Sequence, residues 1–427
     1  MKKEISIPLR IGLIIYMFLS IFNPDFFPME MVSLMTYVGI AIVLLFICNQ
    51  HGITFTKELF YPLRVFLPFL VYFLAITFIF CFSSIGQRGL FLNNLTAYII
   101  PLSKWYVAYL VFYYISNSFK LDTNEYMSLL MMVGIVQTIC VILALFFPRI
   151  RDVFNGFTIA NSQSQHMKDY VLMNNQRSFG LADNLFDSFG YTTSFIIVYT
   201  FILSISKNTK FILLFLVMLF MPLLNTRTGV LLVGVCGVLV VLYFYSTVFI
   251  NKWLRTVTTA IITALCAMAL YSIVPEDTKT WIEDGFKAIY VLFSSGERTS
   301  GFAAMERMIG IPEHFIIGEC CSPESLGRGA TDIGYVQCIW RFGLIGTTLL
   351  LYGFFRVFKL GYVKANSKEQ KCFSICAGII FFVYLYKLYS IGNPCGNFII
   401  FTWLAVIING DRNEHENHIY HFERLEN

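Results

Sequence analysis

The sequence predicts an all-α polytopic membrane protein with about 12 transmembrane helices, from its composition and from its hydropathy pattern. Of its 427 residues, 57% are hydrophobic and 13% are charged, whereas a soluble domain is about 25% charged. Apolar runs of about 18 to 22 residues recur along the chain, and this length crosses roughly 30 Å of hydrocarbon as a helix. A transmembrane β-barrel would instead show segments of about ten residues with alternating polarity, a pattern that we do not find.

The apolar runs place the expected spans in order along the chain. They lie at roughly 9–27, 31–48, 62–82, 95–117, 125–147, 184–205, 209–225, 228–249, 254–274, 332–358, 371–391 and 395–409. The first run lacks a small-residue cleavage site, so we expect a retained helix rather than a signal peptide. The intervals 148–183 and 275–331 are too long and polar for tight connections. We therefore expect one transmembrane domain over 1–427, with a first long periplasmic loop at 148–183 and a second at 275–331.

The distribution of lysine and arginine predicts the orientation. A cytoplasmic amino terminus places the basic short loops inside, as the positive-inside rule requires. Both long loops then face outward and both termini are cytoplasmic. This orientation assigns 13 of the 31 basic residues to the outer side, and nine of those 13 are arginine. Outward arginines favour bidentate recognition of phosphate or carboxylate, and attraction to anionic lipid headgroups is the alternative.

The stretch Asn-Thr-Arg-Thr-Gly at 225–229 is the first candidate site segment, because an apolar run follows it directly. Arg227 would lie at the outer end of a span, and Gly229 would permit close approach of a ligand to the backbone. A helix that starts here adds N–H groups and its positive dipole end, which together suit an anion. The alternative is that Arg227 extends to the lipid headgroups.

The second long loop carries the next segment, Gly-Glu-Arg-Thr-Ser-Gly at 296–301, which runs on to Arg307 and to His-Phe-Ile-Ile-Gly at 314–318. The pattern predicts an amphipathic helix that could lie on the membrane surface and hold Arg298 and Arg307 over a lipid-linked substrate. Glu297 precedes Arg298 and is a candidate to accept the proton of a hydroxyl nucleophile. A solvated loop helix docked on the bundle is the alternative.

The third segment, Thr-Asp-Ile-Gly-Tyr at 331–335, opens a span that continues through Arg-Phe-Gly-Leu-Ile-Gly at 341–346. Asp332 is either an N-cap or, if it faces the cavity of the arginines, the group that accepts a proton from a hydroxyl nucleophile. Tyr335 follows it as a candidate substrate-binding residue. Arg341 would lie about two turns into the membrane, where a charge needs a partner or a wet cavity.

The end of the first long loop supplies the fourth segment, in which Arg177 is followed by the Asp183–Asn184 pair at the expected membrane surface. Asp183 is a candidate proton acceptor, and a helix cap is the alternative. Lys104 and Lys387 lie within apolar runs and also need partners or water.

Metal and cofactor sites are not expected. Most of the 11 cysteines lie inside apolar runs, where they act as small buried hydrophobic residues. Cys320 and Cys321 are adjacent, and no Cys-x-x-Cys pair accompanies them as a structural zinc site requires. His415, His418 and His421 are expected to belong to a solvated tail.

Taken in order, these segments resemble the Wzy-type O-antigen polymerases and their relatives, the O-antigen ligases. The resemblance rests on Arg-x-Gly at a span start, an arginine-bearing outer loop with a Phe-Ile-Ile-Gly turn, and an Asp-x-Gly-Tyr helix start followed by Arg-Phe-Gly-Leu-Ile-Gly. It covers 177–346. It implies a GT-C-like glycosyltransferase fold and metal-independent transfer on the periplasmic side of a bacterial inner membrane.

The resemblance also implies site roles. Arg227 and Arg298 would hold the leaving diphosphate, and Asp332 stands where ligases carry a catalytic histidine, which favours a polymerase. The substrate-binding residues would be Arg177, Asp183, Asn184, Gly229, Glu297, Arg307, Tyr335 and Arg341. The expected reaction transfers a glycan from undecaprenyl diphosphate onto a sugar hydroxyl of the next lipid-linked unit, without a cofactor.

The expected partners are the lipid-linked oligosaccharide, the bilayer, a chain-length regulator and a flippase, and no nucleic acid. The alternatives that stay open are an O-antigen ligase, another envelope glycosyltransferase, a transporter or flippase of the lipid-linked unit, and a non-enzymatic partner of the assembly machinery. A transporter typically places its polar groups near mid-membrane, whereas here they concentrate in the outer loops.

Overall fold

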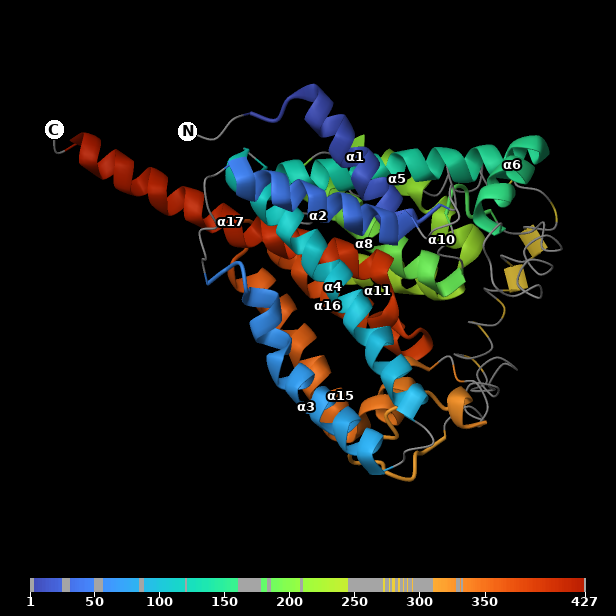
Figure 1. Ribbon diagram of the computed structural model, residues 1–427. Coiled ribbons are helices and arrows are strands. Elements are labelled where there is room, and N and C mark those ends of the chain that lie inside the picture. Colours follow the sequence, from blue (N-terminus) through green and yellow to red (C-terminus); the bar gives the residue numbers. More distant parts are fainter. Residues whose placement is uncertain are drawn as a thin grey trace.

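The computed structural model describes residues 4–24, 31–49, 57–83, 88–119, 121–159, 178–182, 186–207, 210–244, 310–327, 331 and 333–425, together with single positions between 272 and 294. This part of the chain is helical and contains no β-strand (Figure 1). The helices are α1 (Ile7–Phe22), α2 (Met31–Asn49), α3 (Tyr61–Ser83), α4 (Arg88–Ser118), α5 (Thr123–Phe146), α6 (Pro148–Ile159), α8 (Phe186–Ser206), α9 (Lys210–Met218), α10 (Phe220–Asn225), α11 (Arg227–Tyr243), α15 (Gly334–Val363), α16 (Lys368–Lys387) and α17 (Pro394–Leu425), with short 3₁₀ turns η3 (Glu324–Leu326) and η4 (Ser390–Gly392).

Over the described chain, the helices agree in position with the expected spans. Seven of them, namely α2, α3, α4, α5, α8, α15 and α16, are long and apolar enough to cross a membrane, and α1, α9–α10, α11 and the start of α17 are shorter apolar helices. Every expected span except the one at 254–274 coincides with a described helix, and that one lies almost wholly outside the described residues. The first long loop is partly helical, because α6 occupies its first twelve residues.

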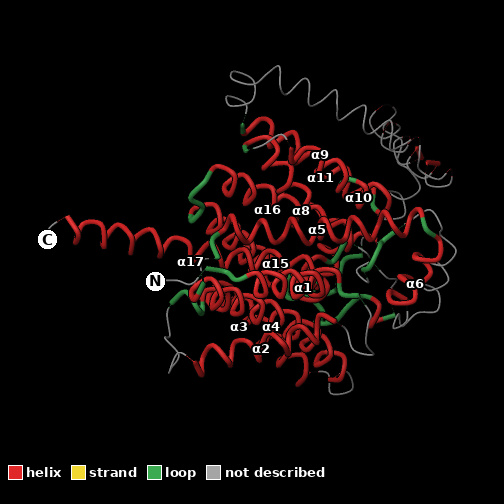
Figure 2. The backbone as a smooth tube through the Cα atoms, turned by 90° about the horizontal axis from the view of Figure 1, so that it is seen from above, coloured by secondary structure: helices red, strands yellow, loops and turns green. Residues whose placement is uncertain are grey.

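The first part of α17 forms the centre of the bundle. Its residues 395–409 are all buried, and it packs along α4 and also against α1, α5 and α8. Figure 2 shows α9 and α11 beyond α8 and α16 on one flank, and α2, α3 and α4 on the other. Polar side chains of α17 have partners within the bundle: Thr402 bonds Tyr126 at 2.7 Å, and Asn409 donates to the Tyr113 carbonyl at 2.8 Å. A bilayer offers no water, so such internal pairing is required.

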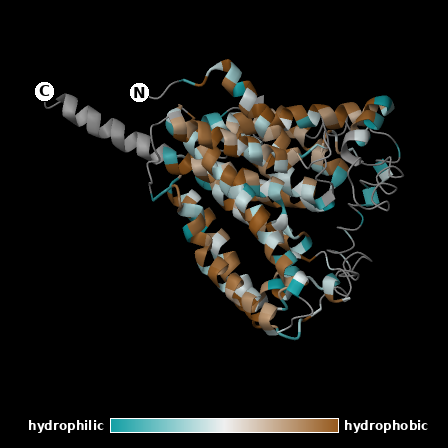
Figure 3. Ribbon diagram, in the orientation of Figure 1, coloured by the Kyte–Doolittle hydropathy of each residue, from teal (hydrophilic) through white to brown (hydrophobic). Residues whose placement is uncertain are grey.

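Large apolar side chains cover the outside of the bundle. On α3, for example, Leu67, Val71 and Phe78 are each more than half exposed, and Figure 3 shows apolar residues along the outer sides of α2, α3 and α15. A soluble protein rarely exposes contiguous apolar surface of this extent. The protein is therefore a multi-pass helical membrane protein by length, composition and surface.

A break at Gly343 divides α15 into two helices. Gly343 has φ 64° and ψ −175°, far from helical values. A residue with a side chain rarely adopts this conformation. The break leaves the amides that follow it without their helical acceptors, and inside a membrane such amides need new ones.

The Phe-Ile-Ile-Gly turn at 315–318 fills this break. Leu344 donates its N–H to the Phe315 carbonyl at 3.0 Å, and Ile345 donates to the Ile316 carbonyl at 3.2 Å. Gly318, at φ 82°, lies so close that a Cβ on it would clash with the backbone of Phe342 and Gly343. The two sequence motifs at 314–318 and 341–346 therefore form one interlocked backbone unit, to which Tyr72 of α3 adds a hydrogen bond to the Phe342 carbonyl at 3.2 Å.

Replacing Gly343 with alanine should destabilise the protein by about 2 kcal/mol or more, because the new Cβ meets the backbone of 316–318 and the φ is unfavourable. The matched control is Gly234→Ala on α11, where a Cβ meets nothing within 4 Å. Thermal denaturation in detergent measures the difference. Equal melting temperatures for the two variants would contradict the interlock.

Candidate functional site

The carboxyl end of α16 is where three of the candidate segments meet. Lys387, the last residue of α16, forms a salt bridge with Asp187 of α8 at 3.2 Å. It also donates a hydrogen bond to the Thr228 hydroxyl of α11 at 3.0 Å. The side chains of Lys387 and Asp187 are 37% and 25% exposed, so the pair is only partly buried. One cation thus joins α8, α11 and α16.

The segment 225–229 begins α11, and Arg227 is the first residue of that helix and is exposed. Thr226 is the N-cap, and its hydroxyl accepts the N–H of Gly229 at 2.8 Å. That N–H is therefore engaged within the protein. A Cβ on Gly229 or on Gly190 of α8 would clash with the Thr226 hydroxyl. Gly190 thus serves the close packing of α8 on the start of α11, and both glycines lie against the hydroxyl of Tyr384 in α16.

Asn225 attaches the end of the first long loop to this helix start. Its amide nitrogen donates to the Ser178 carbonyl at 2.6 Å, and its amide oxygen accepts the Ser178 N–H at 3.1 Å. The Asn225 side chain thus pairs with Ser178 as a second backbone strand would. Ser178 directly follows Arg177, so the fourth segment joins the first at this point, although Arg177 itself lies outside the described residues.

The start of α15 packs against the same end of α16. Gly334 lies so close that a Cβ there would meet the Leu385 and Leu388 carbonyl oxygens at about 2.5 Å. Tyr335 donates its hydroxyl to the Phe382 carbonyl of α16 at 2.9 Å, which is a structural use of a residue expected to bind substrate. The N-cap of α15 is Ile333, without a side-chain cap. Asp332, one residue earlier, lies outside the described residues.

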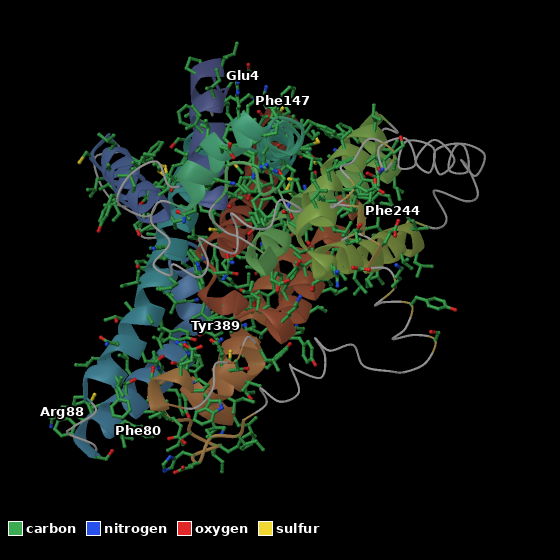
Figure 4. All side chains as sticks on the ribbon, turned by 90° about the vertical axis from the view of Figure 1, so that its right-hand side faces the viewer. Glu4, Phe80, Arg88, Phe147, Phe244 and Tyr389 are labelled. Carbon is green, nitrogen blue, oxygen red and sulfur yellow. The ribbon has the colours of Figure 1, made fainter. Side chains whose placement is uncertain are left out.

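Arg341 lies beside the break in α15, about two turns from the helix start. It donates to the Asn94 side-chain oxygen of α4 at 3.1 Å. Its guanidinium carbon lies 5.1 Å from the ring centre of Tyr389 and 5.9 Å from that of Tyr98. Tyr389 follows α16 by two residues and lies near the middle of the face shown in Figure 4. The sequence expectation that Arg341 needs a partner is met by an amide and two aromatic rings.

The remaining candidate residues cannot be placed. Those that lie outside the described chain are Arg177, Asp183, Asn184, Glu297, Arg298, Arg307 and Asp332. Of the expected site residues, Arg227, Gly229 and Tyr335 lie on helices that contact the carboxyl end of α16. Arg341 lies against Tyr389, which follows that end. Asp187, Asn94, Tyr98 and Tyr389 were missed; for Asp187 the signal was available, because it is an acidic residue inside an apolar run.

The second long loop returns to the bundle through 310–327. Trp340 of α15 donates to the Gly310 carbonyl at 2.8 Å, and His314 pairs with Glu319 at 3.1 Å. Cys320 and Cys321 are buried here, and burial raises the pKa of their thiols to about 12 and about 11. Among the described residues no three His, Cys, Asp or Glu side chains gather as metal ligands would, and His415, His418 and His421 have no described side chains.

No family model matches the sequence, and no curated protein matches it either.

Replacing Asn225 with leucine should destabilise the protein by about 2 kcal/mol, because the buried N–H and carbonyl of Ser178 both lose their partner. Asn124→Leu is the control, since Asn124 is exposed and accepts only from Lys207. Thermal unfolding in detergent reports both changes. A melting temperature for Asn225→Leu that equals that of the control would show that the Ser178 link contributes nothing.

Cys320 and Cys321 should resist alkylation at pH 7.5. A pKa raised to about 12 or 11 leaves far less reactive thiolate than an ordinary thiol near 8.5 has at that pH, so the rate should rise steeply only as the pH approaches 11. Mass spectrometry after N-ethylmaleimide treatment measures it, with exposed Cys48 as the reference. Rapid labelling of Cys320 in the folded protein at pH 7.5 would contradict its burial.

Proposed function

We propose that this protein is a polysaccharide polymerase that transfers a glycan from undecaprenyl diphosphate onto a sugar hydroxyl of the next lipid-linked repeat unit, at the periplasmic face. The observation that carries the proposal is the meeting of three candidate segments at the end of α16. Ser178 bonds Asn225, Lys387 bonds Thr228, and Gly334 packs on Leu388. Residues far apart in the sequence are thereby held at one place on the bundle.

The composition of this meeting point suits a diphosphate. Arg227 is exposed at the first position of α11. The side chain of Lys387 is partly exposed and donates a hydrogen bond to Thr228, the residue that follows Arg227. Two cations next to a helix start can stabilise an oxyanion without a metal ion. The ion pair with Asp187 holds the Lys387 ammonium in place. Arg177 and Arg298 are proposed as further contributors to the same clamp.

The proposed step is a displacement at the anomeric carbon of the donor sugar. The acceptor hydroxyl oxygen forms a bond to that carbon, and the bond from the carbon to the diphosphate oxygen breaks. The leaving diphosphate keeps the electron pair, and its developing charge is stabilised by the arginines and Lys387. The hydroxyl proton passes to a carboxylate, for which Asp332 is proposed, with Glu297 and Asp183 as alternatives.

The alternatives from the sequence differ in their products. A ligase would move finished glycan onto another lipid acceptor, and a transporter would form no glycosidic bond. Deleting the gene distinguishes a polymerase from a ligase, because loss of a polymerase leaves single-unit product and loss of a ligase leaves unmodified acceptor. Purified protein that forms oligomers from lipid-linked units without added metal would exclude a transporter.

Arg298→Ala and Arg227→Ala should each lower polymer formation by about 30- to 1,000-fold, which corresponds to about 2–4 kcal/mol of lost transition-state stabilisation. The measurement is the chain-length ladder formed from lipid-linked units by protein in nanodiscs. Arg356→Ala is the control, because Arg356 is exposed and near the opposite end of α15. A normal ladder from stably inserted Arg298→Ala would remove that residue from the mechanism.

A further inference from the structure

Arg341 is a cation without a counterion in the described part of the chain. No described carboxylate forms a salt bridge with it. Glu324 attracts it electrostatically but is exposed and lies beyond ion-pair distance. A lone charge at this depth of a membrane protein costs several kcal/mol unless something compensates it. The two tyrosine rings compensate part of that cost.

Four hydrogen-bonding groups around this guanidinium have no partner among the residues that the structure describes. They are the Arg341 Nε, the Asn94 side-chain nitrogen and the hydroxyls of Tyr98 and Tyr389. Asn94 and Tyr98 are 6% and 3% exposed, so open water does not satisfy them. Buried polar groups almost always have partners, and a cluster of unpaired ones indicates a missing ligand or ordered water. Arg341 and Tyr389 are intermediate in exposure as whole residues, whereas the four unpaired atoms themselves are buried.

The chemistry of the four groups selects the ligand. Arg Nε and the amide nitrogen can only donate, and each tyrosine hydroxyl can donate as well. A set of donors grouped around one positive charge fits an oxyanion, whose oxygens accept several hydrogen bonds at once. A neutral ligand would leave the charge of Arg341 uncompensated.

We propose that Arg341, Asn94, Tyr98 and Tyr389 form a second oxyanion subsite, which holds the diphosphate of the acceptor lipid. The proposal rests on the polymerase function, because a polymerase joins two lipid-diphosphate substrates and must hold both anions together. Lys387 and Tyr389 lie two residues apart at the end of α16, with Lys387 directed to α8 and α11 and Tyr389 to α4 and α15. The chain segment between them separates the donor clamp from the acceptor subsite.

The test is equilibrium binding of radiolabelled undecaprenyl diphosphate to the full-length protein in phosphatidylcholine nanodiscs. The wild type should bind two molecules, and Arg341→Gln should weaken one of the two sites by about 10- to 100-fold, as the loss of a charged hydrogen bond does. Tyr389→Phe keeps the ring and its packing, so it should weaken the same site by a smaller factor without disturbing the fold. Arg356→Gln and Tyr352→Phe, both at exposed positions of α15, are the matched controls.

A second arm identifies the source of the anion. Nanodiscs that contain phosphatidylglycerol compete at the Arg341-dependent site if a lipid headgroup is the natural occupant, whereas persistent binding of the polyprenyl diphosphate assigns the site to the acceptor substrate. Unchanged two-site binding in both Arg341→Gln and Tyr389→Phe would overturn the subsite. The binding assay is independent of turnover, so two sites without polymer formation would overturn the polymerase proposal and leave the oxyanion subsite standing.

Discussion

Inside a bilayer, a backbone amide that leaves its helix must find an acceptor within the protein, and this constraint organises one end of the bundle. The break at Gly343 exposes two amides, and the carbonyls of the turn at 315–318 accept them. The end of the second long loop is thereby attached to α15 at a fixed register. The attachment also fixes α15 at the level of Arg341, which lies two residues before the break. The break at Gly343 thus sets both the attachment of the turn at 315–318 and the position of Arg341.

The end of α16 has a similar organising role. Close contacts at Gly190, Gly229 and Gly334 allow α8, α11 and α15 to approach α16 more closely than side chains would permit. The polar groups that terminate these helices therefore come together instead of lying at separate points of the surface. Lys387 bridges two of them, and Asn225 adds the end of the first long loop.

Sequence reasoning predicted the helical class and nearly all helix positions in the described chain, because hydropathy directly reports which runs can be buried. It did not predict the break at Gly343 or the early end of α16 at Lys387, since both depend on contacts with distant segments. It singled out Arg341, Lys387 and Lys104 because charges are rare in apolar runs, and Arg227 because it stands beside a glycine at the start of such a run. It missed Tyr98, Tyr389 and Asn94, because aromatic and amide residues are common in such helices and only their positions around Arg341 distinguish them.

The two basic residues near the end of α16, Lys387 and Arg341, differ in the groups that balance their charges. Lys387 has a carboxylate partner and partial exposure, so its charge is balanced whether or not a ligand is present. Among the described residues, Arg341 is surrounded by aromatic rings and unpaired donors and has no carboxylate partner, so a bound anion would balance its charge. A carboxylate beside Arg341 would stabilise the empty protein but compete with an anionic ligand. A protein that must hold two diphosphates and release one after each transfer would gain from such unequal sites. The site of Lys387, whose charge Asp187 already balances, would release its anion more readily than the site of Arg341.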